Sequence, residues 1–360
     1  MNTERLISTF CELVKIPSES PDDQKFLSYV EKFLKIEDCK TRFDAYGNLI
    51  IRFKEKNSKN KTPIAFCCHA DTVKPGKGIR PIVDRDKGII KTDGTTILGA
   101  DDKAGIAEII EMIRASEKHP PIEIILTRCE EIGSLGAKNL DVSLIESKDV
   151  YVLDMDSPDE VVIGEATHIH IDVTYTGKGA HSGVEPEKGL SALLTAVEAI
   201  HKMKLGRLDA ESTANVGIIQ GGEARNSIPE TTKIMAECRS MSNKKALSIA
   251  DEMENIFRNA AKDSGAKVEI VRDIVSNGYV LPKDSKIVKT FVEALEKNGV
   301  KPDIKTITAG TDAGVFHDKG LNAVVVGIGC RDIHSKGEYA IISEMETITN
   351  TIITLVESLA

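Results

Sequence analysis

Histidines and carboxylates that could bind metal ions follow four short, almost wholly apolar runs of the sequence. His69 and Asp71 come after residues 63–68, Glu130 and Glu131 after 122–127, Asp154 after 150–153, and His334 after 323–328 and a short loop. Apolar runs of this length are typical of buried parallel strands. Because ligands of open α/β sheets bind beyond the carboxyl ends of the strands, we expect these side chains to gather at one edge.

The residue types at this edge indicate a metal centre. Neutral imidazoles combined with carboxylates suit zinc, and also cobalt or manganese. The carboxylates outnumber the ligands that one ion needs, and a pair of ions about 3.5–4 Å apart that share a carboxylate accounts for the surplus. Of two adjacent carboxylates such as Glu130 and Glu131, one can bind metal while the other takes a proton from water.

Each element of this pattern also has a simpler interpretation. His69 and Asp71 can be ordinary loop residues, Glu130 and Glu131 a solvated acidic turn, and the pair Asp101-Asp102 a helix N-cap. Their coincidence at several strand ends favours the metal site. Two further histidines, His168 and His170, alternate on one face of an expected strand, and we expect them to pack rather than to bind metal.

Composition excludes several classes of function. The chain has 360 residues and a net charge of −9, because 56 acidic residues outnumber 47 basic ones. An acidic chain without a basic stripe is a poor partner for nucleic acid. We also expect no membrane association, because no uncharged apolar run approaches the ~18 residues of a membrane span. The seven cysteines lack a regular framework, which favours free thiols and a cytoplasmic location.

The order of the expected elements predicts two domains. Strands and helices alternate in the first part of the chain, which is typical of an α/β fold with a mostly parallel sheet and helices on both faces. The middle has the order β-α-β-β-α-β of a ferredoxin-like α+β unit. We therefore expect a catalytic domain formed by residues 1–165 and 278–360, with residues 166–277 as an inserted lid or dimerisation domain.

Nine segments resemble the two-zinc exopeptidase family that includes peptidase T, carboxypeptidase G, aminoacylase and succinyl-diaminopimelate desuccinylase. They are CHADTV (68–73), TDGTTILGADDKAG (92–105), CEEIGSLGA (129–137), VLDMD (152–156), GKGAHSG (177–183), GGEARNSIPE (221–230), ECRS (237–240), AGTDAG (309–314) and IHSKGEYA (333–340). The resemblance covers nearly the whole chain. Residues 92–105 are most similar to peptidase T-like members, which are tripeptide aminopeptidases.

The resemblance implies a role for each residue of the metal centre. One zinc ion would be held by His69, Asp101 and Asp154, and the other by Asp101, Glu131 and His334, with Asp101 as the bridge. Asp71 would orient His69, and the peptide bond between Asp101 and Asp102 would be cis. Glu130 would be the general base that activates a hydroxide held between the two metals, and then the acid that protonates the leaving amine.

The resemblance also implies how substrate binds. His181, Asn226 and Arg239 on the inserted domain, with Gly310 and Thr311 in the loop 310–312, would bind a small peptide. In dimeric members the residue at the position of His181 reaches the active site of the partner subunit, so we expect a homodimer through the inserted domain. Two alternatives stay open: an amidohydrolase of the N-acyl-amino-acid or carboxypeptidase type, and a catalytically silent metal-binding scaffold.

Overall fold

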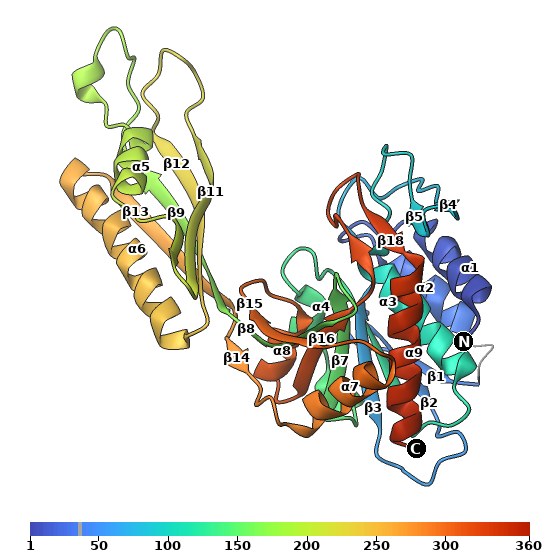
Figure 1. Ribbon diagram of the computed structural model, residues 1–360. Coiled ribbons are helices and arrows are strands. Elements are labelled where there is room, and N and C mark those ends of the chain that lie inside the picture. Colours follow the sequence, from blue (N-terminus) through green and yellow to red (C-terminus); the bar gives the residue numbers. More distant parts are fainter. Residues whose placement is uncertain (35–37) are drawn as a thin grey trace. The chain divides into compact units, whose positions relative to one another are not determined.

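The computed structural model describes residues 1–34 and 38–360 and divides into two compact units (Figure 1). The first unit comprises Met1–Gly164, Val280–Thr306 and Thr311–Ala360, and the second comprises Glu165–Tyr279 and Ile307–Gly310. The second unit therefore takes in Ile307–Gly310, a segment that the sequence analysis assigned to the first domain. The expected fold class is confirmed: an α/β unit carries an inserted α+β unit.

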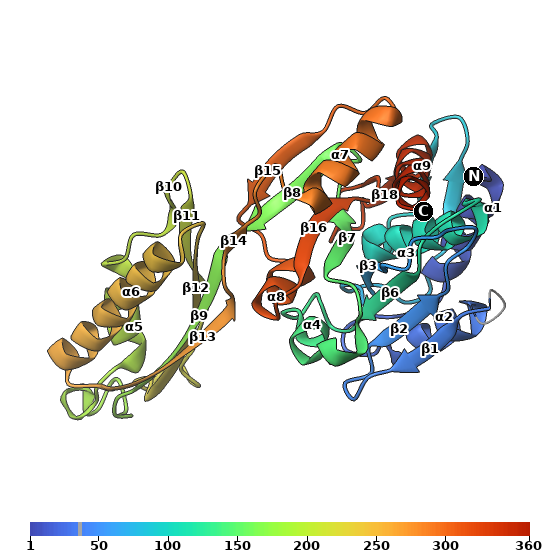
Figure 2. The ribbon, with the colours of Figure 1, turned by 90° about the horizontal axis from the view of Figure 1, so that it is seen from below.

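A mixed sheet forms the centre of the first unit (Figure 2). Its four middle strands are parallel and lie in the order β6 (Ile122–Thr127), β3 (Ile64–His69), β7 (Asp149–Met155) and β16 (Asn322–Gly327). Every residue of β3 and β6 is buried, as expected for parallel strands covered on both faces. These four strands are the four apolar runs of the sequence.

Antiparallel pairs join the flanks of this sheet to its middle strands, which the sequence analysis did not predict. On one side β2 (Leu49–Phe53) pairs antiparallel with β6, and β1 (Lys40–Phe43) pairs antiparallel with β2. On the other side β8 (Glu160–Glu165) pairs antiparallel with β16, and β14 (Tyr279–Val280) and β15 (Asp303–Ile307) pair with β8. A smaller sheet contains β4 (Ile82–Asp84), β5 (Ile89–Lys91), β17 (Cys330–Arg331) and β18 (Tyr339–Ile341).

The helices of the first unit pack against its central sheet and contribute buried residues to its core. They are α1 (Thr3–Val14), α2 (Gln24–Leu34), α3 (Ala100–Ala115), α4 (Leu135–Asn139), α7 (Lys286–Lys297), α8 (Asp312–Asp318) and α9 (Ile342–Ser358). Helix α3 packs against α1, α9 and the central strands, and its residues from Ala100 to Ile113 are all buried. In the described part of the chain, no helix is long and apolar enough to cross a membrane.

The second unit is a five-stranded antiparallel sheet with two helices. The strand order is β10 (Gly206–Asp209), β11 (Ser212–Gly221), β12 (Thr231–Ser240), β9 (Thr167–Thr176) and β13 (Lys267–Ser276). The helices α5 (Ala192–His201) and α6 (Asn243–Ser264) pack against the apolar residues of β9, β12 and β13. Apart from the short strand β10, this is the predicted order of elements.

Candidate metal centre

The ends of neighbouring strands bring the first predicted ligand set together. His69 is the last residue of β3, Asp154 lies near the end of β7, and Asp101 lies at the start of α3. The His69 Nε2 atom is 3.0 Å from Asp101 Oδ1 and 3.9 Å from Asp154 Oδ1. His69 is almost wholly buried, with 2% of its side chain exposed. These three residues offer ligand atoms that all lie within 4.8 Å of one another.

The second predicted ligand set lies on the other side of Asp101. The His334 Nε2 atom is 3.1 Å from Asp101 Oδ2 and 3.0 Å from Glu131 Oε2. The two carboxylate oxygens of Asp101 thus face two different imidazoles, which is the arrangement that a bridging ligand needs. The His334 side chain is 50% exposed, so this side of the centre is open to solvent.

The charges of the cluster fit a pair of divalent cations. Hydrogen bonds that His334 donates to the carboxylates of Asp101 and Glu131 raise its pKa to about 10. Burial raises the pKa of Asp154 well above its ordinary value, and the nearby charge of Asp101 adds to that shift. Glu131 Oε1 is buried and has no hydrogen-bond partner among the described residues. Buried carboxylates that lack partners are costly, and metal cations would neutralise them.

Asp71 contacts His69 through its main chain rather than through its carboxylate. Its backbone oxygen is 2.9 Å from His69 Nδ1, whereas its Oδ1 atom, at 3.6 Å, is too far for a hydrogen bond. The carboxylate instead accepts hydrogen bonds from the backbone N–H groups of Glu130 (2.9 Å) and Glu131 (3.2 Å) and from the Ser20 hydroxyl. Asp71 therefore fixes both the histidine and the acidic loop.

Glu338 is a functional candidate that the sequence analysis missed. Its carboxylate accepts hydrogen bonds from four consecutive backbone N–H groups, those of residues 98, 99 and 100 at 2.7 Å and that of Asp101 at 3.1 Å. These contacts hold the turn that leads into α3, where the Asp101–Asp102 peptide bond is cis, as the resemblance implied. The one feature of the sequence that could have pointed to Glu338 is its position four residues after the predicted ligand His334.

Glu130 belongs to neither ligand set. Its Oε1 atom accepts a hydrogen bond of 3.2 Å from the Ser134 hydroxyl, and burial raises the pKa of its carboxyl group. Asp312 is a second buried acid nearby, and it accepts a hydrogen bond of 2.5 Å from Thr127 Oγ1. Burial raises the pKa of Asp312 to about 6. A carboxyl group with a raised pKa beside a metal centre is suited to carry a proton.

The predicted substrate residues fall into separate groups. His181 and Asn226 are exposed in two loops of the second unit that are joined by a 3.0 Å hydrogen bond from Ser182 N to Asn226 O. Arg239 lies near the other end of β12 and donates to Thr308 O at 3.1 Å, close in sequence to Gly310. Thr311 belongs to the first unit, where it caps helix α8.

The separation within the second unit is large. Thr231, next to the loop of Asn226, and Arg239 are eight positions apart on β12. At ~3.3 Å per strand residue this is about 26 Å. His181 and Arg239 of one chain therefore do not contact the same small peptide through this unit alone.

Comparisons with known proteins agree with this architecture. A family model described as a peptidase dimerisation domain, that of the M20 peptidases, matches residues 163–265, and a model of peptidase family M28 matches residues 48–186. The Bacillus subtilis protein YqjE is 36% identical over the full length of both chains.

Two solved structures also match over nearly their whole lengths. The aminopeptidase PepT from Bacillus cereus is 34% identical, with a TM-score of 0.89, and the match covers 100% of this chain and 99% of that one. A tripeptidase from Staphylococcus aureus is 28% identical with a TM-score of 0.93 and the same coverage. The chain thus belongs to the M20 peptidase family, among relatives of peptidase T, and is a hydrolase of peptide bonds.

Proposed function

We propose that this peptidase is a two-zinc aminopeptidase that removes the N-terminal residue of small peptides, with tripeptides as its main substrates. The observation that carries the proposal is the position of Asp101, whose two oxygens face His69 and His334 at 3.0 and 3.1 Å. The names of the solved relatives, an aminopeptidase and a tripeptidase, support the substrate class. A more distant structure, the YXEP protein of Bacillus subtilis, is described as a dinuclear metal-binding peptidase.

The residues of the first unit divide the work of hydrolysis. His69, Asp101 and Asp154 would hold one ion, and Asp101, Glu131 and His334 would hold the other. When bound, the metals supply a water whose pKa is lowered to about 7 and polarise the scissile carbonyl. Glu130 accepts the proton of that water and donates it to the leaving amine. Asp71 and Glu338 hold Glu130 and Asp101 in the positions that this requires.

The residues of the second unit bind the peptide. Arg239 offers a planar pair of donors that matches a terminal carboxylate. His181 donates a hydrogen bond to the oxygen that becomes negatively charged as the carbonyl is attacked. Because His181 lies in a loop beside the start of β12 and Arg239 lies near its end, we place them in different active sites of a homodimer. The partner subunit's His181 would then complete each site, in agreement with the match to a peptidase dimerisation domain.

A substrate panel tests this proposal. Free-amine tripeptides, dipeptides and N-acetylated amino acids are each incubated with zinc or with a chelator, and the Glu130→Gln variant serves as the control for contaminating peptidases. We expect zinc-dependent release of the N-terminal residue from tripeptides, with blocked substrates untouched. Cleavage of blocked substrates at a similar rate would contradict the proposal and favour the amidohydrolase alternative.

A further inference from the structure

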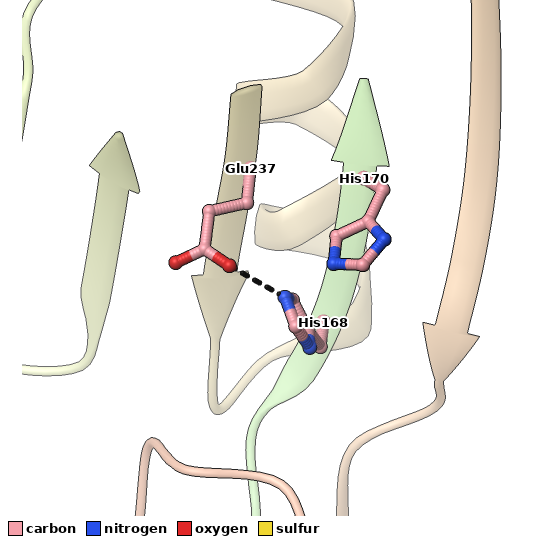
Figure 3. Close-up of side chains that lie close together, drawn as sticks. All are labelled: His168, His170 and Glu237. Carbon is pink, nitrogen blue, oxygen red and sulfur yellow. Dashed lines mark hydrogen bonds and ion pairs between the residues drawn. The ribbon is translucent and has the colours of Figure 1, made fainter. Parts of the chain in front are cut away.

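A second group of metal-ligating side chains belongs to the inserted unit, whereas the residues of the paired centre belong to the first unit. It consists of His168 and His170 on β9 and Glu237 on β12 (Figure 3). The His168 Nε2 atom is 2.7 Å from Glu237 Oε2, and the two imidazole rings lie edge to face with their centroids 4.6 Å apart. One nitrogen of each ring and one carboxylate oxygen lie within 4.8 Å of one another.

The strand geometry explains why these three side chains meet. His168 and His170 are alternate residues of β9 and therefore share a face of the sheet. The register of the antiparallel pair places Glu237 directly opposite His170. The other face of β9 carries Ile169, Ile171 and other apolar residues of the core under α5 and α6. The two histidines lie on the opposite face of β9, where their rings pack edge to face against each other.

The surroundings of His170 favour a cation. In the register of the sheet it has a carboxylate directly across on each side, Glu237 on β12 and Asp273 on β13. The imidazole of His170 therefore lies between two acidic residues of the neighbouring strands.

We propose that His168, His170 and Glu237 form a third metal site, for a zinc-type transition ion. Two imidazoles and a carboxylate are a donor set that zinc and cobalt accept, whereas calcium and magnesium prefer oxygen ligands. Ligands at ~2.0–2.2 Å from a tetrahedral ion are about 3.3 Å apart, so small side-chain rotations close the cluster. Water, or Asp273 on the adjacent strand, would fill the fourth position.

The positively charged side chain of Arg239 lies beside the proposed site and is expected to weaken the binding of a metal ion there. Arg239 Nη2 donates to Glu237 Oε2 at 3.0 Å, the same oxygen that His168 contacts. A metal ion competes with this guanidinium, although Arg239 keeps its hydrogen bond to Thr308 O. Two of the ligands lie on β9 and the third lies on β12. Because all three are on strands of the sheet, no loop has to become ordered when the ion binds. We expect the third ion to bind more weakly than the pair.

Metal counting on the full-length protein tests this site without any measurement of activity. Protein stripped with chelator is dialysed against buffered free Zn²⁺ over a range of concentrations, and the bound metal per chain is measured by mass spectrometry. The wild type is expected to bind three ions, and His170→Gln and Glu237→Gln two. The matched control His201→Gln, an exposed histidine at the end of α5, is expected to bind three.

Cobalt supplies an independent readout. Co²⁺ in a tetrahedral nitrogen and oxygen site absorbs visible light, so filling the third site should add absorption that His170→Gln lacks. Circular dichroism of each variant checks that the sheet is retained. A wild type that saturates at two ions would overturn the proposal, as would a third ion that persists in His170→Gln and Glu237→Gln or disappears in His201→Gln.

Discussion

The Asp71 carboxylate accepts a 2.9 Å hydrogen bond from the backbone N–H of Glu130, so the strand end that carries His69 also positions the proposed general base. In Asp71→Asn, one carboxylate oxygen is replaced by an NH2 group, which cannot accept the hydrogen bonds that the backbone N–H groups of Glu130 and Glu131 donate. For Asp71→Asn we expect a 10–100-fold lower kcat or metal affinity, the usual scale for residues that orient ligands. Kinetics and metal content measure this. Asp86→Asn, at an exposed position, should match the wild type.

The prediction for Glu338 concerns stability, because its carboxylate accepts hydrogen bonds from backbone N–H groups rather than from side chains. In Glu338→Gln, only one oxygen is left for four N–H donors. Leaving buried donors without acceptors costs about 1–3 kcal/mol each, so chemical denaturation should show a clear loss of stability. We also expect weaker metal binding, because Asp101 loses its support. Glu293→Gln on α7 is the exposed control, and equal stability of the two variants would contradict this role.

The proposed division of labour between the two adjacent glutamates is tested at Glu130. For Glu130→Gln we expect kcat to fall about 10²–10⁴-fold, the usual contribution of general acid–base catalysis. Both metals should stay bound, because Glu130 is in neither ligand set. Turnover and metal content are measured on the same sample. A variant with normal turnover, or one that has lost an ion, would be incompatible with the assignment.

Metal binding should release protons at neutral pH. The pKa of His334 is raised to about 10 without metal, and the charge of Asp101 raises the pKa of His69 although burial opposes it. Both rings must lose a proton to bind an ion, so affinity should increase as the pH rises from 6 toward 9. Calorimetry in buffers of different ionisation enthalpy should show a net release of protons on metal binding.

The His334→Gln variant is the control for this prediction, and its proton release should fall by about one. An affinity that does not change with pH would show that the two imidazoles are neutral before metal binds.

A mixing experiment tests whether His181 acts across the dimer. His181→Ala and Glu130→Gln should each be nearly inactive, and His181→Ala should keep its metals. If the partner's His181 completes each site, a mixed dimer has one site with both residues intact. Random exchange of subunits should then restore about a quarter of the wild-type activity. No recovery after subunit exchange would place His181 in the site of its own chain.

The strand ends of the site could be predicted from the sequence because apolar runs of this kind fix both a buried strand and the residue that follows it. His69, Asp154 and Glu131 were found in this way. The position of Glu338 could not, because its four contacts depend on the conformation of the turn before Asp101. The same holds for Asp71, whose main-chain oxygen makes the contact expected of its side chain.

The fold shows a similar limit. The four parallel strands are the four apolar runs, but β1 and β8 lie at the flanks of the sheet. The residues of β1 alternate between exposed and half-buried and include Lys40 and Arg42, so no apolar run marks the strand. The alternation of His168 and His170 predicted the strand β9 correctly.

The central claim is that Asp101 bridges two metal ions, and anomalous X-ray scattering from crystals of the zinc-loaded protein tests it most directly. Our account predicts two zinc peaks about 3.5–4 Å apart, with one oxygen of Asp101 bound to each. One ion should also contact His69 and Asp154, and the other Glu131 and His334. A single peak in this cluster at saturating zinc, or two peaks that do not share Asp101, would contradict the account.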